Sequence, residues 1–463
     1  MNLQQPIAAP VLIGPTPPAK PLPILKAIKL AQNNVMATIP RVAYEEPIWT
    51  SRSFFGGATL VSDPAGVKHV LLDRVANYPK APMERDILSA AFGEGLLTSE
   101  GEKWRAHRRI MSPAFDHRSL VSYAPAMSEN IADFAERWQR LGDGAALNIA
   151  DEMTRLTLQI ISRTMFSADA DDMGDMVGDT MHRGQNLLTV SLLDVLPIVG
   201  PWHLARMMKR VHATFSELDA AMYRLIGTRG KAPGDSPRDL LDRLIAARDG
   251  ETGIGMSDRE VRDEVVIIFL AGHETTAVAM TFVWYLLSQH PHAEAKLHAE
   301  LEAVLGGRPP THADLANLPY TRMVIEEAMR LYPPAPGMAT RQAAEDDEIC
   351  GHKVKKGAMI AVLPWVLHRH QTLWDDPLCF DPERFSAENK ARQPRFAYLP
   401  FGGGPRICIG AQLAMTEASL ILATLAQRFR LRLAPGQHIE LQSRVTLRPK
   451  GGIGMVVEKR LQE

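Results

Sequence analysis

The sequence predicts one large, mainly α-helical domain with a small β part, preceded by a proline-rich segment. Three observations lead to this prediction. A long helix pattern runs from residue 257 to residue 289, short strand-like runs are confined to residues 57–62 and to the chain beyond residue 348, and no long linker interrupts residues 40–463. We therefore divide the chain into an N-terminal segment, residues 1–39, and a single domain, residues 40–463.

The elements before the long helix follow from apolar periodicity and from prolines and glycines. Residues 1–23 hold seven prolines and no basic region followed by an apolar run, so we expect neither a signal peptide nor a membrane anchor. A strand is expected at residues 57–62 and a helix at 64–72. Residues 85–230 are mostly helical in pattern, with a loop at 93–101, a break at 197–201 and a turn at 231–238.

The long helix carries its own start signal. Ser257 and Glu260 form a capping box, and the pattern continues to Gln289, just before Pro291. At 1.5 Å per residue such a helix is roughly 50 Å long, enough to cross a whole domain. Beyond it we expect a helix at residues 320–331, strands at 348–350 and 354–355 around a turn at 351–352, a strand at 358–363, a helix at 411–428 and a strand at 453–458.

Charge and cysteine content narrow the class of protein. Lys and Arg total 52 against 53 Asp and Glu, which does not indicate a charge-driven partnership with nucleic acid or an anionic membrane. Cys350, Cys379 and Cys408 are too few and too widely spaced for a disulfide framework, and they contain no CxxC pair. We expect a monomeric, cytoplasmic protein.

The segment from Phe401 to Gly410, FGGGPRICIG, places Cys408 just before the expected helix at 411–428. Its glycines let the backbone turn tightly and approach a flat ligand. The helix N-terminus is expected to favour a thiolate at Cys408. A lone cysteine is more often a small buried apolar residue, which is our reading of Cys350 and Cys379. The spacing is neither GxxxxGK[ST] nor GxGxxG, so a phosphate loop is not indicated.

This decapeptide resembles the cysteine loop of the cytochrome P-450 superfamily, Phe-x-x-Gly-x-Arg-x-Cys-x-Gly, at every fixed position. The resemblance implies a soluble bacterial-type haem-thiolate monooxygenase with haem b as cofactor and Cys408 as the iron ligand. It also implies the family fold, in which a long distal helix lies over the haem and the cysteine loop lies on the proximal side. Phe401, Arg406 and Gly410 are then cofactor-binding residues.

Three further motifs occur in the family's order. Glu327 and Arg330 share a helix face and alone would suggest a surface ion pair. With Arg384 of the later Pro-Glu-Arg-Phe run, the resemblance implies a buried triad that supports the cysteine loop. Trp104 and Arg108 resemble the Trp-x-x-x-Arg element that reaches a haem propionate.

The resemblance places Arg341 and Arg406 at further propionate positions, where the planar guanidinium suits a carboxylate. Arg105 and Arg109 are more simply read as solvated surface charges.

The middle of the long helix reads Ala-Gly-His-Glu-Thr-Thr, residues 271–276, and interrupts an apolar run. It is not HExxH, so a zinc protease site is excluded. The resemblance implies the oxygen-activation stretch: Ala271 and Gly272 border the cofactor, with Gly272 making room for dioxygen. Thr275 acts as the hydrogen-bonding alcohol and Glu274 as the acid that delivers protons through water. His273 is read as a helix histidine facing packing or solvent.

The implied reaction inserts one oxygen atom of dioxygen into an apolar substrate, by hydroxylation or epoxidation. Fatty acids, terpenoids and aromatic hydrocarbons fit equally well. From family position, the pocket is expected to be lined by a loop at residues 82–97, by residues 186–193, 335–338 and 445–446, and by Phe269, Ala271 and Thr275. Electrons are expected from a separate ferredoxin or flavodoxin-type donor with its reductase, docking on a basic set: Arg105, Arg109, Lys390, Arg392 and Arg395. A peroxide-driven enzyme of the same fold and a haem sensor are the alternatives.

Overall fold

The computed structural model describes residues 12–51, 57–167, 200–229, 239–443 and 445–460. The fold is mainly α-helical with small β-sheets, as the sequence predicts. The α-helices are α1 Ile24–Ala31, α2 Pro64–Lys68, α3 Pro82–Phe92, α4 Gly101–Met111, α5 His117–Leu141, α6 Ile149–Phe166, α8 Gly200–Arg229, α9 Leu240–Ala246, α10 Asp258–Gln289, α11 Pro291–Leu305, α12 Pro319–Leu331, α13 Pro364–Leu367, α14 Ala387–Arg392 and α15 Ala411–Arg428.

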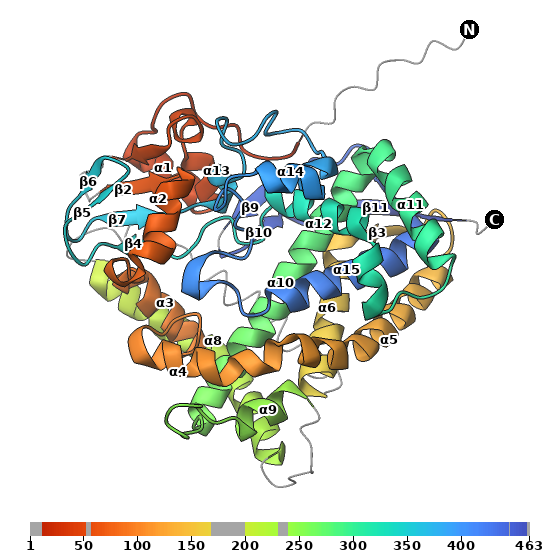
Figure 1. The fold of residues 1–463 in the computed structure, drawn as a ribbon, viewed down its shortest axis with the longest axis horizontal. Helices are drawn as coiled ribbons and strands as arrows, with labels where there is room; N and C mark the ends of the chain where they lie inside the picture. Colours follow the sequence, from red (N-terminus) through yellow and green to blue (C-terminus); the bar gives the residue numbers. More distant parts are fainter. Residues whose placement is uncertain (1–11, 52–56, 168–199, 230–238, 444, 461–463) are drawn as a thin grey trace.

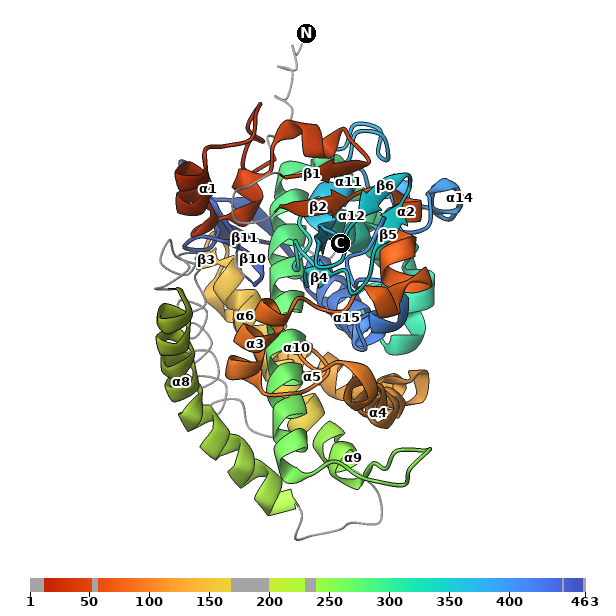
Figure 2. The ribbon, with the colours of Figure 1, turned by 90° about the vertical axis from the view of Figure 1, so that its left-hand side faces the viewer.

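Helix α10 is the axis of the molecule and runs through it from end to end (Figure 2). The capping box predicted for its start is present: the Ser257 N–H donates to the Glu260 carboxylate at 2.9 Å. By length and composition α10 could cross a membrane, but 78% of its most apolar window is buried inside the protein, as expected of a core helix. It packs against α6, α12 and α15.

Within the described residues the strands are short and form four separate sheets. They are β1 Ile48–Thr50, β2 Ala58–Val61, β3 Ala146–Asn148, β4 Arg341–Gln342, β5 Asp347–Ile349, β6 His352–Val354, β7 Met359–Ala361, β8 Phe429–Leu433, β9 Leu441–Ser443, β10 Leu447–Pro449 and β11 Gly454–Lys459. The largest sheet, in the order β1-β2-β7-β4, lies at one edge of the molecule, at the upper left of Figure 1. The others are β3-β11-β8, β5-β6 and β9-β10.

The structure corrects three local expectations. The turn between β5 and β6 lies at Cys350 and Gly351, one residue earlier than expected, because both residues adopt positive φ angles (46° and 83°), as a two-residue hairpin of this type requires. The helix expected at residues 64–72 ends at Lys68 and continues as the π-helical turn η3, His69–Asp73. Residues 82–92, expected as a pocket loop, form α3.

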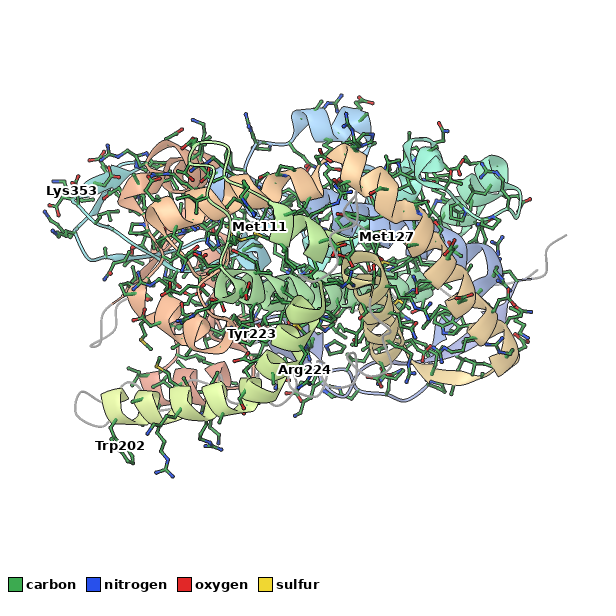
Figure 3. All side chains as sticks on the ribbon, turned by 90° about the horizontal axis from the view of Figure 1, so that it is seen from below. Met111, Met127, Trp202, Tyr223, Arg224 and Lys353 are labelled. Carbon is green, nitrogen blue, oxygen red and sulfur yellow. The ribbon has the colours of Figure 1, made fainter. Side chains whose placement is uncertain are left out.

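Other expectations are met or lie outside the described residues. The helix over residues 411–428 has the predicted bounds. Helix α8 begins at Gly200, with Pro201 in its first turn, and the exposed Trp202 projects from that end (Figure 3). Residues 186–193, 197–199 and 231–238 are not described. The segment 1–39 contains α1, so the boundary at residue 40 stays a prediction.

Candidate functional site

Cys408 lies in the turn between the short 3-10 helix η9, Gly404–Arg406, and α15. Its backbone N–H donates to the Phe401 carbonyl at 2.9 Å, which closes the loop. Burial raises the pKa of the Cys408 thiol, while a hydrogen bond from the Gly410 N–H and the charge of Arg108 lower it by less. Cys408 is nevertheless exposed to solvent, so its sulfur is accessible to a ligand beside the helix start that is expected to favour the thiolate.

One position of this loop requires a glycine because a neighbouring backbone segment lies close to it. Gly404 has φ +67°, and a Cβ there would overlap the backbone carbonyl oxygen of Leu71 in η3. Gly402 has a similar φ of +75°, yet a Cβ there would meet its nearest atom, Met338 Sδ, at an ordinary 3.6 Å. The close approach that requires a glycine at residue 404 is thus to another backbone segment.

Positive side chains gather beside the cysteine loop. The Arg406 guanidinium lies 4.3 Å from the centre of the Trp104 ring, and Arg108 Nη1 donates to the Ile407 carbonyl at 2.9 Å. Arg406 also pairs with Glu100. Trp104, Arg108 and Arg406 come from α4 and the cysteine loop, so the fold brings these three sequence-predicted residues together.

Arg341 on β4 is buried, and its Nε and Nη1 have no hydrogen-bond partner among the described residues. Such unpaired donors are costly unless a ligand meets them. Lys80 lies beside Arg341 through a backbone bridge, and burial together with the charge of Arg406 lowers the pKa of Lys80 to about 7. Arg406 pairs with Glu100, and the charges of Lys80 and Arg341 act on the same carboxylate; the haem propionates fit this set of donors. Sequence reasoning missed Lys80, which no motif or periodicity marks.

Helix α10 presents an accessible face at its middle. Ala271 is exposed and Thr275 partly exposed, although Phe269 and Thr276 on either side are buried. The Thr275 hydroxyl donates to the Ala271 carbonyl at 2.6 Å, and the helix is α-helical throughout. A face of small residues opening from a core helix suits a flat cofactor and a small gaseous substrate.

Two other residues of this stretch serve packing. A Cβ on Gly272 would overlap Cδ1, the flexible end of the Ile161 side chain, so Gly272 faces α6. This contact with Ile161 is a packing role for Gly272 that the sequence did not suggest. The role of Gly272 towards dioxygen stays a prediction. His273 is buried, and its Nδ1 lies 2.6 Å from the Phe269 carbonyl. Burial lowers the pKa of His273, in keeping with a packed neutral histidine.

Glu274 is buried and directed towards the antiparallel pair β9–β10, the C-terminal hairpin. Its Oε1 accepts a hydrogen bond from Arg448 Nε at 2.7 Å and another from the Thr446 hydroxyl. Neither Arg448 nor Thr446 was named as a partner by the sequence, because they lie more than 170 residues away and belong to no motif.

Glu327 and Arg330 on α12 form a fully buried pair, joined at 2.6 and 2.7 Å. Arg384 Nε lies 3.6 Å from Glu327 Oε1. Arg330 also donates to three backbone carbonyls, those of His368, Pro377 and Cys379. The three residues meet, and they tie α12 to the chain that leads to the cysteine loop.

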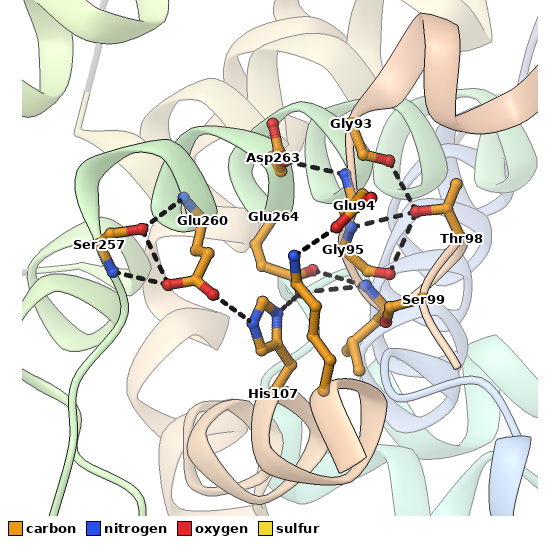
Figure 4. A network of polar contacts seen from close by, with 12 residues as sticks. Gly93, Glu94, Gly95, Thr98, Ser99, His107, Ser257, Glu260, Asp263 and Glu264 are labelled. Atoms are coloured by element: carbon orange, nitrogen blue, oxygen red, sulfur yellow. Dashed lines mark hydrogen bonds and ion pairs between the residues drawn. The ribbon is translucent and has the colours of Figure 1, made fainter. Parts of the chain in front are cut away.

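The loop between α3 and α4 is fastened to the start of α10 (Figure 4). The Leu96 N–H donates to the buried Glu264 carboxylate at 3.0 Å, and the Glu94 N–H donates to Asp263 at 2.8 Å. His107 Nδ1 lies 2.6 Å from Glu264, and its Nε2 lies 3.4 Å from Glu260. This network holds the loop between α3 and α4 against α10, and no sequence motif predicts it.

The basic set expected to dock an electron donor is largely paired within the chain. Four of its members have a carboxylate partner: Arg105 with Glu102, Arg109 with Asp249, Lys390 with Glu326 and Arg392 with Glu388. Pairing reduces the field that these side chains offer to an acidic partner, which weakens the docking prediction.

Comparison with known proteins gives the family and the fold of the chain. The cytochrome P450 family model matches residues 15–455. Cyclooctatin synthase of Streptomyces melanosporofaciens is 37% identical over 80% of this chain and 79% of its own length. Cyclooctat-9-en-7-ol 5-monooxygenase of the same organism is 36% identical over 82% and 81%. The crystal structure of the cytochrome P450DA heme domain superposes with a TM-score of 0.81, at 28% identity, covering 96% of this chain and 94% of that one.

The match covers nearly the whole chain, and the relatives exceed 30% identity over most of their lengths. By sequence and by fold, the chain belongs to the cytochrome P450 family of haem monooxygenases.

Proposed function

We propose that this monooxygenase oxidises an apolar terpenoid, with haem b held by Cys408. The observation that carries the substrate class is the similarity to two enzymes whose names refer to cyclooctatin and cyclooctat-9-en-7-ol. The accessible face of α10 at Ala271 and Thr275 is small and uncharged, in keeping with an apolar substrate. Fatty acids and aromatic hydrocarbons are the competing classes.

The residues divide into roles around the haem, which when bound supplies the oxidation chemistry. Cys408 is its iron ligand, with Phe401 and Gly410 bordering the loop. Trp104, Arg108, Arg341 and Arg406 hold the propionates, and the unpaired donors of Arg341 support this assignment.

On the other side, Ala271 and Gly272 border the cofactor. Thr275 serves as the hydrogen-bonding alcohol, and Glu274 delivers protons. Glu327, Arg330 and Arg384 support the proximal loop.

The test of the iron ligand is the carbon monoxide difference spectrum of the dithionite-reduced protein, for wild type and Cys408→Ser. A strongly red-shifted Soret band in wild type that is lost in the variant is the expected result. A histidine-like band in folded wild type would refute ligation by a thiolate.

The substrate class is tested by spin-state titration with cyclooctat-9-en-7-ol, palmitic acid and naphthalene. The terpenoid should produce the largest high-spin shift and an oxygenated product. Binding and turnover of palmitic acid alone would replace the proposal with a fatty-acid hydroxylase.

Electrons are proposed to come from a separate ferredoxin or flavodoxin-type protein in the cytoplasm. Turnover with such a donor and its reductase supports this source. Product formation with hydrogen peroxide but with no reductase system would point to the peroxide-driven alternative.

A further inference from the structure

The C-terminal hairpin reaches the middle of α10 and contacts its one buried acid at residues 271–276. Glu274 Oε1 accepts from Arg448 Nε at 2.7 Å, and Arg448 Nη2 and the Thr446 hydroxyl approach the same oxygen. The Glu274 side chain is 6% exposed and that of Arg448 is 32% exposed. A buried carboxylate in the core helix is thereby connected to a cation that reaches the solvent.

The backbone that carries Arg448 is held on two sides. The Leu447 N–H donates to the Pro334 carbonyl at 3.0 Å, next to the end of α12. On the partner strand β9, the Leu441 carbonyl accepts from Asn34 Nδ2 at 2.9 Å, and the Ser443 N–H donates to the Asn33 carbonyl at 3.1 Å. The backbone of Arg448 is therefore held in place by contacts with two other parts of the chain.

Thr275 follows Glu274 but does not share its side of the helix. Successive helix residues point about 100° apart, since 3.6 residues make a turn. The Thr275 hydroxyl donates to Ala271 at 2.6 Å, whereas the carboxylate lies at the hairpin. Accessibility increases from Glu274 to Arg448, so the hairpin edge is where water can bring a proton to this acid.

We propose that Arg448 is a positioning residue that holds the Glu274 carboxylate at the hairpin edge, where it takes up protons from water for delivery towards Thr275. The inference rests on the proposed function of Glu274. In each transfer, a proton from water at the hairpin edge bonds to a carboxylate oxygen of Glu274. The same carboxyl group then gives a proton to water beside Thr275. The carboxylate is restored, and no electron moves.

The chain offers a matched control. Arg432 on β8 pairs with Glu294 on α11 at 2.9 Å, and the two side chains are 32% and 6% exposed, the same as the Arg448–Glu274 pair. Arg432→Met thus removes an ion pair of equal burial, together with the more exposed pair between Arg432 and Glu458, from elements other than α10 and the C-terminal hairpin.

The experiment compares the haem-loaded wild type with Arg448→Met, Arg448→Lys, Glu274→Gln, the double variant Arg448→Met/Glu274→Gln, and Arg432→Met. The first readout is urea unfolding, analysed as a double-mutant cycle. The second is product formed per reduced nicotinamide consumed with cyclooctat-9-en-7-ol, together with KM and the solvent deuterium isotope effect on turnover.

In Arg448→Met we expect product per nicotinamide to fall about ten-fold, less than the roughly hundred-fold minimum for loss of a general acid, because the Glu274 carboxylate itself is retained. The solvent isotope effect should rise while KM is unchanged, and Arg448→Lys should recover part of the loss. Arg432→Met should lose stability but keep the wild-type ratio. In the double-mutant cycle, adding Glu274→Gln to Arg448→Met should lower the free energy of unfolding by little more than Arg448→Met alone.

Equal losses of product ratio in Arg448→Met and Arg432→Met would overturn the inference, because a general loss of stability would then explain both. Additive effects in the cycle would overturn it as well, and so would a Glu274→Gln variant that behaves like wild type. If wild type shows the thiolate spectrum but converts no tested compound, the terpenoid proposal fails instead. The cycle then still decides whether Arg448 holds Glu274.

Discussion

Replacing Gly404 with alanine tests whether the cysteine loop is limited by its contact with η3. Gly404 and Gly402 both have positive φ, so an alanine at either residue costs roughly 1–2 kcal/mol of backbone strain. At Gly404 the new Cβ also overlaps the Leu71 carbonyl oxygen and lies 2.8 Å from its carbonyl carbon. Displacing that backbone should cost roughly a further 1–3 kcal/mol, by analogy with overpacked cores.

The assay is urea unfolding of Gly402→Ala and Gly404→Ala beside wild type, at one protein and haem concentration. Gly404→Ala should be the less stable variant by about 1–3 kcal/mol, the difference contributed by the overlap. Its carbon monoxide spectrum should also show a larger share of the non-thiolate form. Equal stabilities of the two variants would refute the reasoning, because backbone strain alone would then account for both.

Three further outcomes follow from the geometry. Gly272→Ala adds a methyl group that overlaps only Cδ1, the flexible end of Ile161, whereas alanine in a helix interior is favoured over glycine by roughly 0.5–1 kcal/mol. In thermal unfolding, Gly272→Ala should therefore stabilise the Ile161→Val variant, which lacks Cδ1, more than it stabilises wild type; equal effects would contradict the contact. Burial lowers the pKa of His107, but Glu264 and Glu260 outweigh burial and raise this pKa above 6.5. The stability advantage of wild type over His107→Gln should therefore be full below pH 6.5 and fade as the pH rises through the raised value. An advantage that does not change with pH would argue against the pairing. Lys80→Met should release haem to apomyoglobin about ten-fold faster than wild type, as expected for losing one hydrogen bond to a charged group. Lys103 pairs with Glu94, and Lys103→Met should release haem at the wild-type rate.

The main helices and the family membership could be read from local sequence. The capping box at Ser257 and Glu260, the helix over residues 411–428 and the cysteine decapeptide are all short-range patterns, and the structure and the family match agree with them. Such features depend on residues a few positions apart, so a linear pattern contains what they need. The three-residue separation of Glu327 and Arg330 belongs to the same kind.

Turn and helix ends were less well determined. The hairpin at Cys350 is one residue displaced from the expectation because a non-glycine residue there accepts a positive φ, for which the sequence gives no marker. The end of α2 at Lys68 likewise depends on how η3 packs, since Leu71 must lie against Gly404, more than 300 residues away.

What only the tertiary structure decided is which distant groups meet. Lys80 and the unpaired donors of Arg341 gather through a strand bridge, and Arg448 reaches Glu274 from a hairpin near the end of the chain. Each such contact joins residues that share no periodicity, and its strength comes from burial and charge once the chain has folded. The sequence by itself predicted the family and the place of Cys408 just before its helix, because these depend on local patterns; the contacts around that loop arise only from packing.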